Sequence, residues 1–221
     1  LVSASRPPHK EGLARWTGWA RRMAEKAGVT VRYGADVTGE MIAPGAPDSV
    51  ILASGALPSV PPIPGIDGPI VCDARDVLTG KAEVKSPAVV LGAGYVGMET
   101  ADFLMQRGIA VTVLEMSAAP PVPSFTAHGY WLHRRLKKGG RLVLGARVTS
   151  IDADGVRFEL DGKESSEPAA MVVTALGARS ERDLEEACAA AGCPCVVVGD
   201  AVQPRRLIEA IHEGAKAGRE M

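Results

Sequence analysis

Residues 87–115, PAVVLGAGYVGMETADFLMQRGIAVTVLE, decide the fold of this chain. The stretch opens with an apolar run that is typical of a strand buried on both faces. Gly92, Gly94 and Gly97 follow with the spacing G-x-G-x-x-G, and a second apolar run ends in Glu115. A strand, a glycine-rich turn, a helix and a second strand that ends in an acid predict a dinucleotide-binding βαβ unit.

Each glycine has a separate mechanical role in this motif: a tight turn, close approach of backbone to a diphosphate, and close packing of helix on strand. Unpaired N–H groups at the start of the helix, near Tyr95, carry partial positive charge and stabilise a diphosphate. Glu115 lies 18 residues beyond Gly97, close to the spacing at which a carboxylate accepts hydrogen bonds from ribose. The alternative is a purely structural glycine turn in an unrelated α/β protein.

The composition is that of an ordinary globular protein: 221 residues, 46% hydrophobic, 23% charged and a formal net charge of −1. Such a balance gives no reason to expect nucleic acid or an anionic membrane as partner. The basic run 133–138 is interpreted as the solvated face of a helix. No apolar run reaches the roughly 18 residues that span a bilayer, and the start lacks signal-peptide features. We therefore expect a cytoplasmic protein.

The cysteines and histidines predict neither a catalytic residue nor a metal site. Four cysteines in a chain of this size do not indicate a disulfide scaffold. Cys193 and Cys195 have C-x-C rather than C-x-x-C spacing and are interpreted as small buried thiols. The four histidines show no triad or ligand spacing, so each is expected at the surface or as a cap.

The other elements are predicted from hydrophobic periodicity and turn residues. Trp16 and Trp19 fall on the apolar face of a predicted helix and are expected to be core anchors. Helices are expected at 10–27, 125–138, 181–191 and 205–219; β-like runs at 29–33, 49–53, 171–175 and 195–198; a hairpin or meander over 141–151 and 155–160; a proline-rich connector at 57–64; and a turn at 199–201.

One pattern occurs twice, at residues 50–56 and 172–178: apolar, apolar, x, Ala, x, Gly, Ala. It indicates two similar nucleotide-binding modules, with a coincidence of two strand ends as the alternative. The second module has a glycine-rich turn ahead of it, whereas no such turn precedes residue 50. We therefore expect the chain to be a piece of a longer polypeptide.

The chain resembles the pyridine nucleotide-disulfide oxidoreductases, which are flavoproteins with two dinucleotide-binding domains. More narrowly, it is similar to the C-terminal reductase part of old-yellow-enzyme-like proteins typified by 2,4-dienoyl-CoA reductase and trimethylamine dehydrogenase. The stretches that carry this resemblance cover nearly the whole chain: 7–11, 50–56, 73–80, 89–99, 174–179, 199–201 and 204–206.

The resemblance implies an α/β fold with two Rossmann-like, three-layer domains, in which the NAD domain is inserted into an incomplete FAD domain. Residues 1–80 and 181–221 would be the two FAD-domain segments, and residues 81–180 the NAD(P)H-binding domain. Asp200 would contact the flavin, although at a strand end before a helix it could equally be a turn or cap residue. The implied NADH-binding residues are Gly92, Ala93, Gly94, Tyr95, Val96, Gly97, Glu115 and Gly177, and the implied FAD-binding residues are Ala53, Ser54, Gly55, Gly199 and Asp200.

The resemblance also implies partners outside the chain. A flavin-bearing barrel, with FMN and an iron–sulfur cluster where the parent protein has them, would lie upstream together with the substrate site. The redox-active cysteine pair of the disulfide reductases is absent from the sequence, which agrees with the dienoyl-CoA reductase branch. A homo-oligomer is left open.

The sequence predicts NADH rather than NADPH as the nucleotide. A carboxylate at Glu115 accepts from a ribose 2′-OH but repels a 2′-phosphate, and Met116, Ser117 and Ala118 offer no compensating cation. We expect the chain to pass hydride from NADH to FAD for a substrate site elsewhere. The alternative hypothesis is a non-catalytic dinucleotide-binding module that serves as a redox sensor or a structural domain.

Overall fold

The computed structural model describes residues 1–42 and 47–221. Contacts within the chain define two compact units, one of residues 1–29 and 60–177 and the other of residues 30–59 and 178–221. Each unit is described separately below. Because the domains expected from the sequence are defined by the cofactor they would bind, their boundaries at 80 and 180 stay a prediction.

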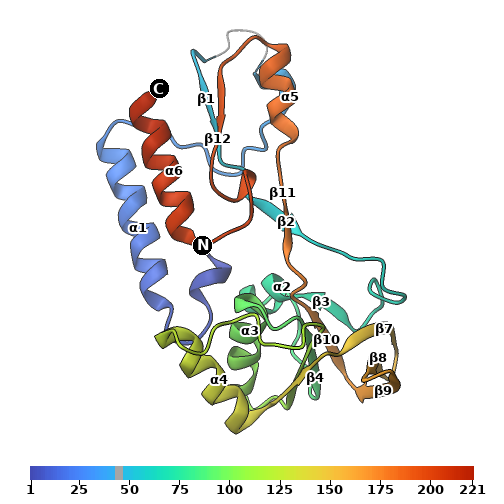
Figure 1. The fold of residues 1–221 in the computed structure, drawn as a ribbon. Coiled ribbons are helices and arrows are strands. Elements are labelled where there is room, and N and C mark those ends of the chain that lie inside the picture. Colours follow the sequence, from blue (N-terminus) through green and yellow to red (C-terminus); the bar gives the residue numbers. More distant parts are fainter. Residues whose placement is uncertain (43–46) are drawn as a thin grey trace. The chain divides into compact units, whose positions relative to one another are not determined.

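The first unit is built on a five-stranded parallel sheet with the order β3-β10-β4-β5-β6 (Figure 1). Residues 88–91 and 111–115 form adjacent parallel strands, as their apolar runs predict. The strands are β3 (Val71–Asp73), β4 (Ala88–Leu91), β5 (Val111–Glu115), β6 (Arg141–Leu144) and β10 (Met171–Thr174).

Helices cover one face of this sheet, and an antiparallel meander packs on the other. Alternate residues of β4 divide between two cores: Val90 packs with the helices, and Val89 packs with the meander. The result is the three-layer α/β arrangement expected from the sequence. The helices on this face are α2 (Ala74–Thr79), α3 (Tyr95–Met105) and α4 (Ala127–Gly139), and the meander strands are β7 (Arg147–Asp152), β8 (Gly155–Leu160) and β9 (Lys163–Pro168). The unit also contains α1 (Glu11–Lys26), which buries none of its residues.

The second unit contains two small sheets. In one, β1 and β12 pair in parallel, and in the other, β2 and β11 pair antiparallel. Its elements are β1 (Val50–Leu52), β2 (Ala56–Pro58), β11 (Ala178–Ser180), β12 (Cys195–Val197), α5 (Asp183–Ala190) and α6 (Leu207–Glu220). Short 3₁₀ turns occur at η1 (Ser3–Ser5) in the first unit and at η2 (Gly39–Met41) and η3 (Gly199–Ala201) in the second.

Three sequence-based expectations are corrected by the structure. Residues 29–33 form no strand, because Gly28 and Gly34 on either side adopt positive φ angles and turn the chain. Trp16 and Trp19 are not core anchors: α1 forms as predicted, but the two side chains are 39% and 52% exposed. Residues 141–144 join the parallel sheet as its edge strand, so the meander consists of β7, β8 and β9.

Candidate functional site

The turn between β4 and α3 has the geometry that the glycine pattern predicts. Gly92 adopts a φ of +98°, and a Cβ there would lie 2.6 Å from the carbonyl oxygen of Ala175. A Cβ on Gly97 would lie 1.9 Å from the carbonyl oxygen of Gly92, so only glycine lets α3 pack this closely. A Cβ on Gly94 would meet no atom within 4 Å. The middle glycine therefore leaves open space at the N-terminus of α3.

Glu115 is fixed by two backbone donors. The N–H of Ala93 donates to Oε2 at 2.7 Å, and the N–H of Ser117 donates to Oε1 at 2.8 Å. The residue is 9% exposed. Burial by itself would raise the pKa of Glu115, but the two N–H groups more than offset it and hold the pKa below its ordinary value of 4.5. The carboxylate is therefore ionised at neutral pH, and each oxygen retains a lone pair for a further donor.

A cavity of about 480 Å³, here called the glycine-turn pocket, opens beside these residues. It lies at the carboxyl ends of β4, β5 and β10, which is where ligands bind in open parallel sheets. Three predicted site residues line it: Gly92, Gly94 and Glu115. The remaining lining residues are Pro61, Ile63, Leu91, Leu114, Met116, Pro121, Ala146, Arg147, Val148, Ala175 and Leu176.

The other predicted residues of the first unit surround the turn without lining the pocket. Ala93 and Gly97 are buried, whereas Tyr95 and Val96 are 37% and 50% exposed at the start of α3. Gly177 follows Leu176, adopts a φ of +92° and would place no Cβ within 4 Å of another atom. The structure thus gathers the sequence-predicted residues of this unit around one turn.

A buried carboxylate that the sequence-based interpretation missed lies one turn into α3. Glu99 is 6% exposed, accepts from His128 Nε2 at 2.8 Å and pairs with Lys10. The His128 ring also stacks on Tyr95, with centroids 5.7 Å apart. His128 is therefore tied to a buried acid rather than being a plain surface or cap residue. The signal available in the sequence was a charged residue two positions after Gly97, in a helix predicted to pack against the sheet.

In the second unit, the predicted flavin-facing residues follow two neighbouring parallel strands. Residues 53–55 come directly after β1, and Gly199 and Asp200 lie just beyond β12. The N–H of Val198 donates to the carbonyl oxygen of Leu52 at 3.0 Å, which brings the two strand ends together. The structure therefore places these five residues at the ends of two adjacent strands.

Much of the hydrogen-bonding capacity of this second group is used internally. The Ser54 hydroxyl donates to the carbonyl oxygen of Glu181, and the N–H of Gly199 donates to Glu213 Oε2 at 2.7 Å. Asp200 Oδ1 accepts from the N–H of Arg205 at 3.0 Å. Asp200 thus has the turn role that the sequence left open. Gly55, by contrast, would place no Cβ within 4 Å of another atom and leaves space for a ligand.

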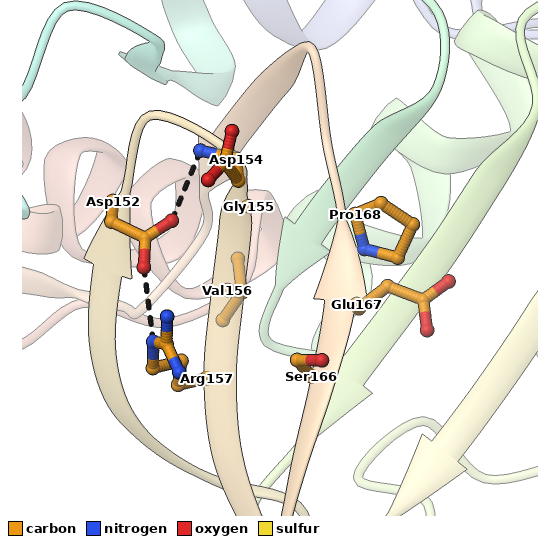
Figure 2. A pocket seen from close by; sticks show the side chains of 8 residues that line it. All are labelled: Asp152, Asp154, Gly155, Val156, Arg157, Ser166, Glu167 and Pro168. Atoms are coloured by element: carbon orange, nitrogen blue, oxygen red, sulfur yellow. Dashed lines mark hydrogen bonds and ion pairs between the residues drawn. The ribbon is translucent and has the colours of Figure 1, made fainter.

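A different hollow, of about 330 Å³, lies on the meander and shares no lining residue with the glycine-turn pocket. Figure 2 shows that Asp152 is engaged there by the N–H of Asp154 and by Arg157, each at 3.0 Å. These contacts are local to the β7–β8 hairpin. The hollow therefore adds nothing to the candidate site.

Residues 1–42 and 47–221 contain neither a metal-binding cluster nor a membrane-spanning helix. Within these ranges, no three His, Cys, Asp or Glu side chains are grouped to hold a metal ion. Across the same part of the chain, no helix has both the length and the apolar character needed to cross a membrane.

The fold and the glycine turn define a Rossmann-type nucleotide-binding protein. The family model for pyridine nucleotide-disulphide oxidoreductase matches residues 23–203. The chain belongs to this family, as the sequence resemblance predicted, and the family uses NAD(H) and FAD.

Several known proteins that are similar to this chain are much longer than it is. It is 33% identical to an NADH oxidase of Thermoanaerobacter brockii over 97% of the chain and 34% of that protein. It is 36% identical to a bilirubin reductase of Mediterraneibacter gnavus over 81% of the chain and 28% of that protein. A solved structure of 2-naphthoyl-CoA reductase superposes with a TM-score of 0.91 and 27% identity, over the whole chain and 34% of the other. The chain thus spans about a third of each of these relatives.

Proposed function

We propose that this chain is the NADH-binding reductase part of a flavin-dependent oxidoreductase that serves a substrate site outside the chain. The observation that carries this proposal is the position of Glu115. Its ionised carboxylate is fixed by the N–H of Ala93 on the wall of a pocket that also contains the open space at Gly94.

The glycine turn fits the diphosphate of a dinucleotide. The first N–H groups of α3, from Tyr95 onward, have no intrahelical acceptor and point out of the helix N-terminus. The missing side chain at Gly94 lets a diphosphate approach these groups closely. Tyr95 and Val96 at the exposed start of α3, and Gly177 after Leu176, would contact the rest of the nucleotide.

The ribose of the adenosine would be held by Glu115. A carboxylate already fixed by two backbone donors loses little freedom when it accepts a ribose hydroxyl. The same negative charge opposes a 2′-phosphate, so NADH is preferred over NADPH.

The cofactors supply the redox chemistry: NADH carries a hydride and FAD accepts it. The residues of this chain bind and orient the two cofactors and provide no general acid or base. On the family pattern, Ala53, Ser54, Gly55, Gly199 and Asp200 would contact FAD, and their grouping at the ends of β1 and β12 supports this assignment. Residues 81–180 would then be an NAD(P)H domain between two FAD-domain segments.

A narrower assignment, to the dienoyl-CoA reductase and trimethylamine dehydrogenase branch, is also part of the proposal. Structural similarity to 2-naphthoyl-CoA reductase over the whole chain supports it. In this branch the flavin barrel that acts on substrate would belong to another part of the polypeptide.

Titration of the full chain with NADH and NADPH tests the proposal. Glu115→Ala should weaken NADH binding about 10- to 150-fold, because it removes charge-assisted hydrogen bonds. Glu164→Ala is a matched control, since this glutamate is exposed on β9 and does not line the pocket. Equal or tighter binding of NADPH by the unmodified chain would contradict the assignment.

A second measurement separates an enzyme from a non-catalytic binding module. In a polypeptide that extends this chain to the length of its relatives, flavin absorbance bands should bleach when NADH is added. Bands that persist while NADH binds would favour the sensor or structural alternative.

A further inference from the structure

A positively charged side chain lines the wall of the glycine-turn pocket, and no pattern in the sequence near Glu115 predicts it. Arg147, at the start of β7, lines the same cavity as Glu115 although the two are far apart in the chain. The preceding residue, Ala146, donates its N–H to the main-chain oxygen of Glu115 at 2.8 Å. Gly145 donates in the same way to Ser117 at 3.0 Å. The loop that leads into β7 is thus hydrogen-bonded to the segment that carries the predicted nucleotide specificity.

The charge of Arg147 is already paired on the meander. Arg147 and Glu159 are direct cross-strand partners in the β7–β8 ladder, and Arg147 Nη2 forms an ion pair with Glu159 Oε2. The two side chains are 62% and 40% exposed, so the pair is in solvent and its guanidinium can be redirected at small cost.

We propose that Arg147 is a specificity-determining residue of the nucleotide site and that Glu159 limits its use. A guanidinium binds a phosphate dianion through paired N–H donors, so a free Arg147 would attract the 2′-phosphate of NADPH. Paired to Glu159, it leaves Glu115 as the dominant charge in the pocket, and NADH is favoured. This inference rests on the proposed function. It adds the pair Arg147–Glu159 to Glu115 as a determinant of the preference for NADH.

The experiment is a double-mutant cycle on the full chain, with Kd values for NADH and NADPH as the measurements. Glu159→Gln should tighten NADPH binding about three- to tenfold and change NADH binding less than about twofold. Adding Arg147→Met should abolish this gain. The cycle is repeated in a Glu115→Gln background, where the carboxylate that would repel the 2′-phosphate of NADPH is absent.

Asp152→Asn is the matched control. It releases Arg157 from a second ion pair on the same meander. In that pair Asp152 is 40% exposed, like Glu159, and Arg157 is 65% exposed, close to the 62% of Arg147. Arg157 does not line the glycine-turn pocket, so NADPH binding should not change. Denaturation midpoints of all variants verify that each is folded.

The outcomes separate this inference from the proposed function. A gain in NADPH affinity that survives Arg147→Met, or that Asp152→Asn reproduces, overturns the role of Arg147 in favour of a general charge effect. If Glu159→Gln does not bind NADPH more tightly, the role of Arg147 is also overturned. The proposed function still holds in that case, provided that the unmodified chain binds NADH. A chain that binds neither nucleotide would refute both.

Discussion

The backbone N–H of Ala93 donates a 2.7 Å hydrogen bond to the carboxylate of Glu115, 22 residues away along the chain. This bond joins the glycine turn after β4 to the carboxyl end of β5. The acid therefore stabilises the turn in addition to the role we propose for it in binding ribose.

Glu115→Gln should lower the free energy of unfolding at pH 7 by about 1.5–3 kcal/mol, because it replaces charge-assisted hydrogen bonds by neutral ones. The pKa of Glu115 is lowered by folding, so its contribution to stability is complete above its ordinary value of 4.5. The contribution is lost as the pH falls through the lower folded pKa.

Urea titrations of both proteins at pH 7 and at successively lower pH values measure this difference. The gap between wild type and Glu115→Gln should narrow below pH ~4. Glu164→Gln, an exposed change of the same kind, should stay within about 0.5 kcal/mol of wild type at neutral pH. A gap that widens in acid would show that the charged form is not the stabilising one.

The glycine turn predicts opposite behaviour for two alanine substitutions. Gly97→Ala should destabilise the chain by about 1–3 kcal/mol or more, because its Cβ would overlap the Gly92 carbonyl oxygen. Gly94→Ala should leave the denaturation midpoint nearly unchanged and weaken NADH binding, because its Cβ would occupy only open space at the helix N-terminus. Unchanged NADH affinity in Gly94→Ala would contradict the predicted approach of the diphosphate.

A buried ion pair joins α3 to α4. Arg135 Nε lies 2.9 Å from both carboxylate oxygens of Asp102, whose side chain is 4% exposed. Arg135→Met should cost about 3–5 kcal/mol of unfolding free energy, because it leaves a buried charge without a partner. Arg134→Met is the control on the same helix, and Asp102→Leu combined with Arg135→Met should recover much of the loss. Equal effects of the two arginine substitutions in thermal or urea unfolding would refute this account.

Cys72 should react slowly with thiol reagents. Burial is the main cause, and together with the nearby carboxylates of Asp76 and Asp73 it raises the pKa of the thiol to about 11. The thiolate fraction at pH 8 is then about one in a thousand, compared with roughly a quarter for an ordinary thiol. Alkylation followed by peptide mass spectrometry should show Cys72 modified at least tenfold more slowly in the folded chain than in urea. Equal rates in the two states would contradict the raised pKa.

The parallel sheet was predictable where short-range pattern is strong. Residues 88–115 contain the strand, glycine turn, helix and second strand in sequence, and the close approach of Gly97 to the Gly92 carbonyl oxygen lies within this stretch. By contrast, the run 141–144 alternates like a hairpin strand. Its pairing with β5 depends on which edge of the sheet is free, and the residues of 141–144 do not specify that edge.

The prediction that Trp16 and Trp19 on α1 are core anchors was wrong for a similar reason. Hydrophobic spacing correctly predicts the helix, but the spacing does not say whether a surface exists to cover Trp16 and Trp19. The buried pairing of Glu99 with His128 and Lys10 also escaped prediction, because these residues come from three separate segments.

By itself, the sequence determined the βαβ unit and the acid at the end of β5, since both depend on spacing within about 30 residues. It also determined the family, through stretches that cover nearly the whole chain. Only the tertiary structure decided that Ala93 fixes this acid and that Arg147 lines the same pocket with its charge paired to Glu159. The position of Arg147 arises where the loop before β7 hydrogen-bonds to residues 115–117. Contacts between distant segments are set by how the layers pack, and no local pattern of residues specifies them.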